Sequence, residues 1–352
     1  MNSKKSINFG LIFVLAVVGL TIWIVFRNQE LPSVLNALSS LDHRWILAAF
    51  GCWFGCVLTE AVWLACYMHH QGYAVRFPYI FFVSVMGSFY CAITPGASGG
   101  QPMQIYYLSK RGVPAGVSSS ALSIRFIQSH ALITLLTLIL WFVRGGLIGE
   151  QLSSVRWLII MGWIVHLAGI VLVLLAAFWK SAVHKAADWL IRAGIKLRII
   201  RKPTVVSEKL CRWIDGYHKN IRAAGQHPKQ IILLTLLTFL SQFLTMATAV
   251  CVYRMFGLTE TSGTDLLSIA YLLHLSASYN PLPGASGAQE GGFLAFFTGI
   301  FPPDKIGLAM LVWRFFTYYL HLLAGSGTLL TGMLRRAFGK RRVGKQKSAS
   351  SS

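Results

Sequence analysis

"TPGASGGQ" at residues 94–101 and "LPGASGAQ" at residues 282–289 are nearly the same phrase, spelled twice in one chain. Each phrase interrupts a long apolar stretch, the first at about 79–109 and the second at about 266–300. Proline and glycine break helices. In a membrane, non-helical backbone survives only where it is buried in protein or lines a wet cavity. The two phrases therefore predict two helical hairpins, each broken at its glycines.

The composition places these hairpins in a membrane. The chain has 352 residues, of which 55% are hydrophobic and 12% are charged, whereas a soluble domain carries about 25% charged residues. The apolar runs are solid blocks and lack the alternation of a β-barrel. Six of them are long enough to cross a hydrocarbon core of about 30 Å: 7–26, 45–68, 116–142, 157–179, 231–253 and 306–334. The predicted fold class is an all-α polytopic membrane protein.

The basic residues predict the orientation of the chain. If each interrupted stretch begins and ends on one side, 24 of the 32 Lys and Arg fall on the same side, against three of the 11 acids. The positive-inside rule makes that side cytoplasmic, with both termini there. Basic residues that flank spans fix topology and meet anionic headgroups. We therefore expect no nucleic acid contact, despite the net charge of +21.

A longer repeat surrounds the two phrases. Pro114 lies eleven residues before Arg125, and Pro303 lies eleven residues before Arg314. Each unit thus reads as a span, a broken hairpin and a second span that carries an arginine. Between the opening spans of the two units the chain crosses an odd number of times, which inverts the second unit. We predict an inverted repeat of two units, each with a re-entrant, glycine-broken helical hairpin, a pattern found in many transporters.

These elements form one predicted transmembrane domain, residues 1–335. The repeat units are about 45–142 and 231–334. Between them, the basic segment 180–230 is expected to form cytoplasmic amphipathic helices. The basic, Ser-rich tail 336–352 is expected to be disordered.

Four formal charges lie inside the predicted spans and hairpins: Glu60, Arg125, Glu290 and Arg314. Such charges cost about 2.5–3.5 kcal/mol each on insertion scales, which makes them functional candidates. A guanidinium group suits bidentate contact with phosphate. We expect Arg125 to meet a lipid phosphate on the cytoplasmic side and Arg314 on the outer side. The glutamates would pair with the arginines when lipid is absent, or meet a cationic headgroup. A purely structural pairing that locks helices remains open.

The phrases themselves are candidate anion sites, because helix N-termini and free backbone N–H groups favour an anion. The residues expected to shape this backbone are Pro95, Gly96, Gly99, Gly100, Pro283, Gly284 and Gly287. Gln101 and Gln289 close the phrases at matching positions and are expected to orient a polar headgroup. The alternative is that glycine and alanine merely allow tight hairpin packing.

Other polar residues in apolar context receive no role at this stage. A lone membrane histidine usually bonds to a neighbouring helix, so no function is assigned to His130, His166, His274 or His321. The six cysteines show no zinc spacing, and no P-loop is present. We expect no metal and no cofactor.

The stretches "TPGASGGQPMQIYYL" (94–108), "IRF" (124–126) and "PLPGASGAQEGGFLAFF" (281–297) resemble the transmembrane, flippase-like domain of lysylphosphatidylglycerol synthases. Stand-alone bacterial and archaeal membrane proteins share that domain. The resemblance runs from about residue 8 to residue 335. It implies a multi-pass protein of the bacterial cytoplasmic membrane that moves or binds phospholipids, such as phosphatidylglycerol or its lysyl ester. In two-part members this function confers resistance to cationic antimicrobial peptides.

Two-part members also carry a cytosolic acyltransferase that takes lysine from lysyl-tRNA, and these residues show no counterpart to it. Whether the chain is an enzyme is therefore left open. The leading hypothesis is a lipid translocator for an anionic or aminoacylated phospholipid. The alternative is a membrane component of phosphatidylglycerol lysyltransferase that works with a separate synthase. A transporter of small solutes or ions is a third hypothesis, and homo-oligomer formation is left open.

Overall fold

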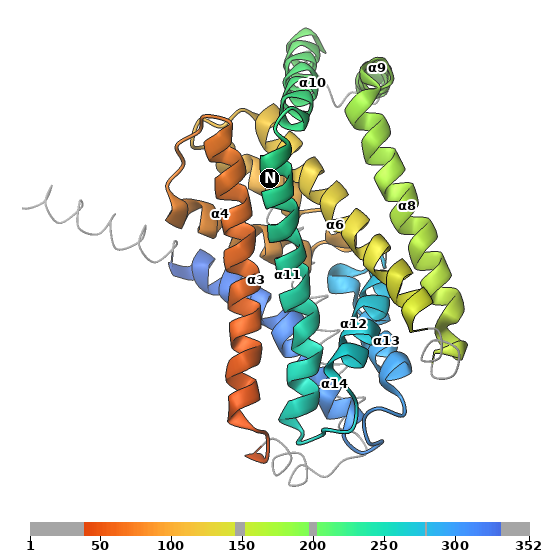
Figure 1. The fold of residues 1–352 in the computed structure, drawn as a ribbon. Helices are drawn as coiled ribbons and strands as arrows, with labels where there is room; N and C mark the ends of the chain where they lie inside the picture. The colour runs from red at the N-terminus through yellow and green to blue at the C-terminus, as the bar shows by residue number, and fades with distance from the viewer. Residues whose placement is uncertain (1–38, 145–151, 197–202, 279, 332–352) are drawn as a thin grey trace, which may run out of the picture.

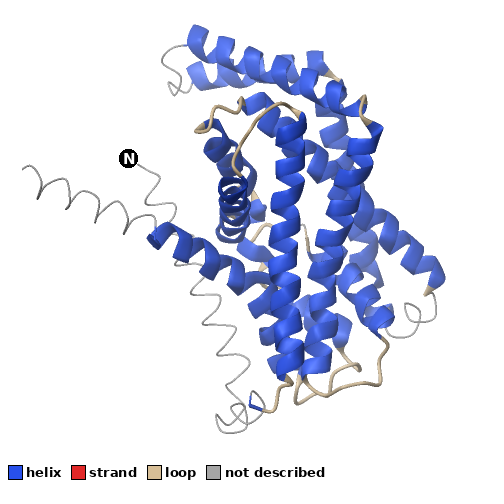
Figure 2. Ribbon diagram, turned by 60° about the vertical axis from the view of Figure 1, so that its left-hand side comes forward, coloured by secondary structure: helices blue, strands red, loops and turns tan. Residues whose placement is uncertain are grey.

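The computed structural model describes residues 39–144, 152–196, 203–278 and 280–331. Within these ranges every named element is a helix, and no strand is drawn (Figures 1 and 2). The prediction of an all-α fold is confirmed. The expected first span, 7–26, and the expected disordered tail, 336–352, lie outside the described residues.

Five helices in the described part of the chain are long and apolar enough to cross a membrane. They correspond to five of the six predicted spans: α3 (His43–His70), α6 (Ala115–Val143), α8 (Arg156–Phe178) with the short η2 (Ser153–Val155) before it, α11 (Pro228–Met255), and the helix Ile306–Thr331. The last of these contains α14 (Ile306–Arg314) followed by the π-helical turn η4 (Phe315–Tyr319).

The opening helices of the two predicted units, α3 and α11, pack against each other and run antiparallel (Figure 1). Asp42 N, at the start of α3, donates to Met255 O at the end of α11 over 3.0 Å. At the other end the rings of His70 and His227 lie 4.4 Å apart. Opposite directions for these two helices are what an inverted repeat requires, and the inversion itself stays a prediction.

The first interrupted stretch forms α4 (Phe77–Ile93), the 3₁₀ turn η1 (Pro95–Ala97) and α5 (Gly100–Ser109). Near the start of α4, Tyr79 donates its hydroxyl hydrogen to Tyr107 O near the end of α5 over 2.8 Å. The stretch therefore returns to the place where it began.

The second interrupted stretch forms α12 (Gly263–Ala277), η3 (Pro283–Ala285) and α13 (Ala288–Phe297). Tyr253, near the end of α11, hydrogen-bonds Thr261 just before α12 over 3.2 Å. Its ring also lies 5.3 Å from that of Phe301, just after α13. This stretch likewise begins and ends in one place, at the opposite end of α11 from His227.

The broken points of the two hairpins contact each other. Gly96 N donates to Pro281 O over 2.8 Å, and the Tyr318 hydroxyl donates to Ala92 O over 3.1 Å. Two phrases 188 positions apart in sequence thus form one junction between the two halves of the chain.

Glycine serves two purposes in the phrases. Gly96 (φ 56°) and Gly284 (φ 62°) adopt left-handed backbone conformations, which cost residues with a Cβ atom about 1–2 kcal/mol. A Cβ atom on Gly284 would also lie 2.1 Å from the ring of Tyr318, and one on Gly100 would lie 2.1 Å from the sulfur of Cys91. The break in the helix and the tight packing are therefore both properties of these positions.

Two amphipathic helices, α9 (Lys180–Lys196) and α10 (Pro203–Gly225), lie across one end of the bundle, at the top of Figure 2. Trp213 donates to the hydroxyl of Ser119 near the start of α6 over 3.0 Å. Lys180 Nζ on α9 lies 2.7 Å from Asp215 Oδ1 on α10, and this contact lowers the pKa of the Asp215 carboxyl. The end of the bundle that α9 and α10 cover is the end expected to face the cytoplasm.

Candidate functional site

All four predicted charged residues inside the bundle form ion pairs. Arg125 on α6 pairs with Glu60 on α3. Arg314 Nε on α14 donates to Glu290 Oε1 on α13 over 2.8 Å. The two pairs differ in exposure: the side chains of Arg125 and Glu60 are 22% and 20% exposed, whereas those of Arg314 and Glu290 are 4% and 9% exposed. Only the first pair is open to an incoming group in this conformation.

The Arg314–Glu290 pair fastens the second phrase. Arg314 Nη2 donates to Gly284 O over 3.1 Å, and the guanidinium lies 4.4 Å from the centre of the Tyr318 ring. Glu290 Oε2 accepts from Gly287 N over 2.7 Å, which caps α13. A buried ion pair is tolerated when further hydrogen bonds satisfy its atoms, and this pair meets that condition.

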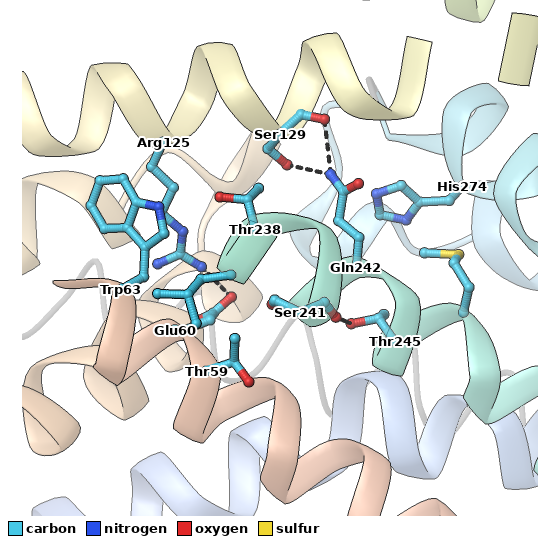
Figure 3. Close-up of a pocket in the computed structure, with 12 residues that line it drawn as sticks. Thr59, Glu60, Trp63, Arg125, Ser129, Thr238, Ser241, Gln242, Thr245 and His274 are labelled. Atoms are coloured by element: carbon cyan, nitrogen blue, oxygen red, sulfur yellow. Dashed lines mark hydrogen bonds and ion pairs between the residues drawn. The ribbon is translucent and has the colours of Figure 1, made fainter. Parts of the chain in front are cut away.

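The Arg125–Glu60 pair instead borders a pocket of about 170 Å³ (Figure 3). One water occupies about 30 Å³ in the liquid, so the pocket can take a polar group the size of a phosphate. Helices α3, α6, α11 and α12 form its wall, with the side chains of Thr59, Glu60, Trp63, Arg125, Ser129, Leu237, Thr238, Ser241, Gln242, Thr245, Met246 and His274.

A stripe of polar residues on α11 supplies one wall of the pocket. Thr238, Ser241, Gln242 and Thr245 follow the i, i+3, i+4, i+7 spacing that puts residues on one helical face. Gln242 Nε2 donates to both the carbonyl and the hydroxyl oxygen of Ser129, each over 2.8 Å. The stripe lies within residues 231–253, which are predicted above only as an apolar span. The helical spacing of its polar residues was the available signal.

The two units differ chemically at their phrases. Pro102 occupies the position in the first unit that Glu290 occupies in the second. Without that carboxylate, Thr94 Oγ1 accepts from Gly99 N over 2.8 Å in the first phrase. Arg125 therefore pairs with Glu60 on α3 and not with a residue of its own hairpin. The units therefore place one arginine beside a pocket and use the other to close a loop.

The expectation of free amides in the phrases is wrong for three of them. Gly96 N donates to Pro281 O, Gly99 N to Thr94 Oγ1, and Gly287 N to Glu290 Oε2. These three backbone N–H groups are engaged in the hairpin junction and at the N-termini of the short helices. They therefore stabilise the bundle and are not available to bind an anion.

The two glutamines of the phrases occupy different surroundings. Gln101 is exposed, whereas Gln289 is buried. Neither side chain is among those that line the Arg125 pocket. Their expected contact with a headgroup stays a prediction.

Three of the four histidines that received no role from the sequence are not isolated. The rings of His130 and His166 lie 4.7 Å apart, and His274 lines the Arg125 pocket. His321 lies elsewhere, with its ring 6.0 Å from that of Trp53. Sequence spacing does not reveal this cluster because its members come from α6, α8 and α12.

The chain matches the family described as the lysylphosphatidylglycerol synthase TM region over residues 11–325. It is also similar to a UPF0104 membrane protein of Archaeoglobus fulgidus, with 23% identity over 328 residues. That alignment covers 91% of this chain and 96% of the archaeal protein. The family match spans the positions of the two phrases and of all four charged residues of the bundle.

Proposed function

This chain belongs to the lysylphosphatidylglycerol synthase TM region family, and we propose that it is an integral membrane translocator for an anionic or aminoacylated phospholipid, such as lysyl-phosphatidylglycerol. The observation that carries the proposal is the pocket beside Arg125 and Glu60, within a bundle of apolar helices. A polar pocket at such depth is expensive to maintain and marks a substrate path by default.

The pocket matches the chemistry of such a headgroup. The guanidinium of Arg125 would bind the lipid phosphate, and the carboxylate of Glu60 would bind an ammonium of the lysyl ester. Hydroxyl and amide groups of the α11 stripe would bind the glycerol and ester oxygens. Exposed leucines on α11, such as Leu233 and Leu236, leave an apolar surface for the acyl chains.

The second ion pair supports movement in a different way. We propose that Arg314 and Glu290 hold the second hairpin closed and meet the headgroup on the outer side once this lock opens. Gln101 and Gln289 would orient the headgroup at the two hairpins. Lipid would then shift the equilibrium between two arrangements of related halves.

The test is headgroup accessibility in proteoliposomes with fluorescent phosphatidylglycerol or its lysyl ester. Arg125→Gln should slow lipid movement roughly 10- to 100-fold, because a hydrogen bond to a charged group contributes about 1.5–3 kcal/mol. Arg144→Gln is the matched control: Arg144 caps the far end of α6 and pairs with Asp265 over 3.3 Å, away from the pocket. Folded wild type that moves neither lipid would contradict the proposal.

The family description also supports a second candidate, a membrane component of phosphatidylglycerol lysyltransferase acting with a separate synthase. In that case the purified chain would be inert, and movement of the lysyl ester would appear only with the synthase present. Either function would contribute to membrane charge and to resistance against cationic antimicrobial peptides. Loss of this resistance in a deletion strain, restored by wild type and not by Arg125→Gln, would tie it to the pocket.

A further inference from the structure

Three histidines from three helices converge next to the Arg125 pocket. His130 on α6 and His166 on α8 have ring centres 4.7 Å apart. His274 lies on α12, which packs against both α6 and α8, and its side chain lines the pocket. Figure 3 shows His274 beside Gln242, on the pocket side of α12. The cluster thus connects the interior of the bundle with the wall of the pocket.

His166 lies beside His130 and has no hydrogen-bond partner in the described part of the chain. Its side chain is 4% exposed, and neither ring nitrogen has a hydrogen-bond partner among the described residues. A buried polar group left unpaired is costly, so such a group invites a ligand that satisfies it. Gly162, one turn earlier, brings α8 against α12, because a Cβ atom there would lie 2.9 Å from Leu275 O. This close approach places His166 at the interface between α8 and α12.

His130 has a nitrogen available for a proton. Its Nδ1 lies 3.0 Å from Phe126 O, and a carbonyl oxygen can only accept, so Nδ1 carries the hydrogen. Nε2 of the neutral ring therefore keeps its lone pair. No group of three or more His, Cys, Asp or Glu side chains in the searched, described residues is arranged to hold a metal ion. The ligand that fits this cluster is a proton.

We propose that the His130–His166–His274 cluster binds one proton when an anionic headgroup binds Arg125, so that lipid and proton move together. This inference rests on the proposed function. In the empty pocket Arg125 and Glu60 neutralise each other. A phosphate on Arg125 leaves the Glu60 carboxylate unpaired, which adds one negative charge inside the membrane. One proton on the cluster restores neutrality, and a second is opposed by like charge.

Apart from Arg125 and Glu60, the described side chains around the histidine cluster contribute no formal charge. Besides Arg125, the titratable groups that interact with Glu60 are Cys56 on α3, Cys91 on α4 and His321 after η4, and Tyr271 precedes His274 by one turn of α12. The α11 wall contributes neutral polar side chains, and residues 157–179 of α8 and its C-cap include no Asp, Glu, Lys or Arg. Arg125 and Glu60 are therefore the full charges that a proton on the cluster must balance.

Coupling of this kind is reciprocal: lipid binding raises the proton affinity, and protonation raises the lipid affinity by the same factor. We expect the affinity for phosphatidylglycerol to rise as the pH falls, because a proton on the cluster favours the state with lipid on Arg125. The change should be at least about fivefold in wild type, a typical allosteric coupling.

The experiment uses purified wild type in phosphatidylcholine liposomes that contain fluorescent phosphatidylglycerol, with an entrapped pH-sensitive dye. A pH gradient should drive net movement of the labelled lipid, with about one proton per lipid by the charge balance above. His166→Gln and His274→Gln should abolish the gradient-driven movement and flatten the pH dependence of binding. His69→Gln, exposed at the end of α3, is the matched control.

If wild type moves the labelled lipid at a rate that depends on neither the pH nor the pH gradient, the proposed proton site is wrong. The proposed function would still stand in that case. No movement by folded wild type at any pH would overturn the proposed function and this inference with it. If His166→Gln does not fold, the wild-type gradient measurement still decides, because it changes no residue, and His274→Gln tests the cluster from the pocket side.

Discussion

The two arginines of the bundle have the same charge and opposite surroundings. Arg314 is buried and contacts Glu290, Gly284 and Tyr318. Arg125 and its partner Glu60 instead border a pocket. One residue type therefore serves as a structural lock in one unit and as a candidate binding group in the other.

This difference predicts unequal effects on stability. Arg314→Gln should lower the free energy of unfolding by about 3–5 kcal/mol, because it leaves the buried Glu290 carboxylate without its cation. Arg125→Gln should cost clearly less, because its more exposed pair can be compensated by solvent. Thermal unfolding of both variants in detergent measures the difference.

A double variant, Arg314→Gln with Glu290→Gln, should recover part of the loss because no charge is left unpaired. Equal destabilisation by Arg125→Gln and Arg314→Gln would contradict this account of the two sites.

Matching glycines in the two phrases should also respond differently. Gly284→Ala meets the Tyr318 ring at 2.1 Å, whereas a Cβ atom on Gly96 has no other atom within 4 Å. We expect Gly96→Ala to cost about 1–2 kcal/mol from its left-handed backbone alone, and Gly284→Ala to cost more. Thermal unfolding compares them, and a smaller effect at Gly284 would argue against the packing described for Tyr318.

At the scale of elements, the contact between α6 and α10 depends on one small residue. A Cβ atom on Gly116 would lie 2.9 Å from Tyr217 N and 3.0 Å from Gly216 C, both backbone atoms that cannot rotate away. Gly116→Ala should therefore push α10 away from the bundle.

Hydrogen exchange of the α10 amides tests this effect, with faster exchange expected in Gly116→Ala. Gly51→Ala is the control, because nothing lies within 4 Å of its Cβ position on α3. That change should leave α10 untouched and stabilise α3 by about 0.5–1 kcal/mol. Unchanged exchange of α10 in Gly116→Ala would show that α10 does not depend on this contact.

At the scale of the whole molecule, the two ends of the bundle should face different compartments. Lys110 follows α5 at the end that α9 and α10 cover, and Glu260 lies between α11 and α12 at the other end. Both residues are exposed.

Single cysteines at these positions, in a background without the six native cysteines, should react with opposite sidedness. A membrane-impermeant thiol reagent added to intact cells should label Glu260→Cys and reach Lys110→Cys only after permeabilisation. Labelling of Lys110→Cys in intact cells would reverse the predicted orientation.

Much of this architecture follows from local rules that a sequence can express. Apolar length predicts the spans, and the proline and glycine of the phrases predict the breaks, because each depends on a few neighbouring residues. The α11 stripe belongs to the same class, since Thr238, Ser241, Gln242 and Thr245 reveal it by helical spacing alone.

By itself, then, the sequence determined the membrane class, the five described spans, the two interrupted stretches and the identity of the four charges within the bundle. Only the tertiary structure decided that Arg125 faces a pocket while Arg314 closes a loop, and that His130, His166 and His274 meet. The physical reason is that ion pairing and desolvation depend on distances between helices far apart in the chain. Helix formation depends mainly on each helix's own residues.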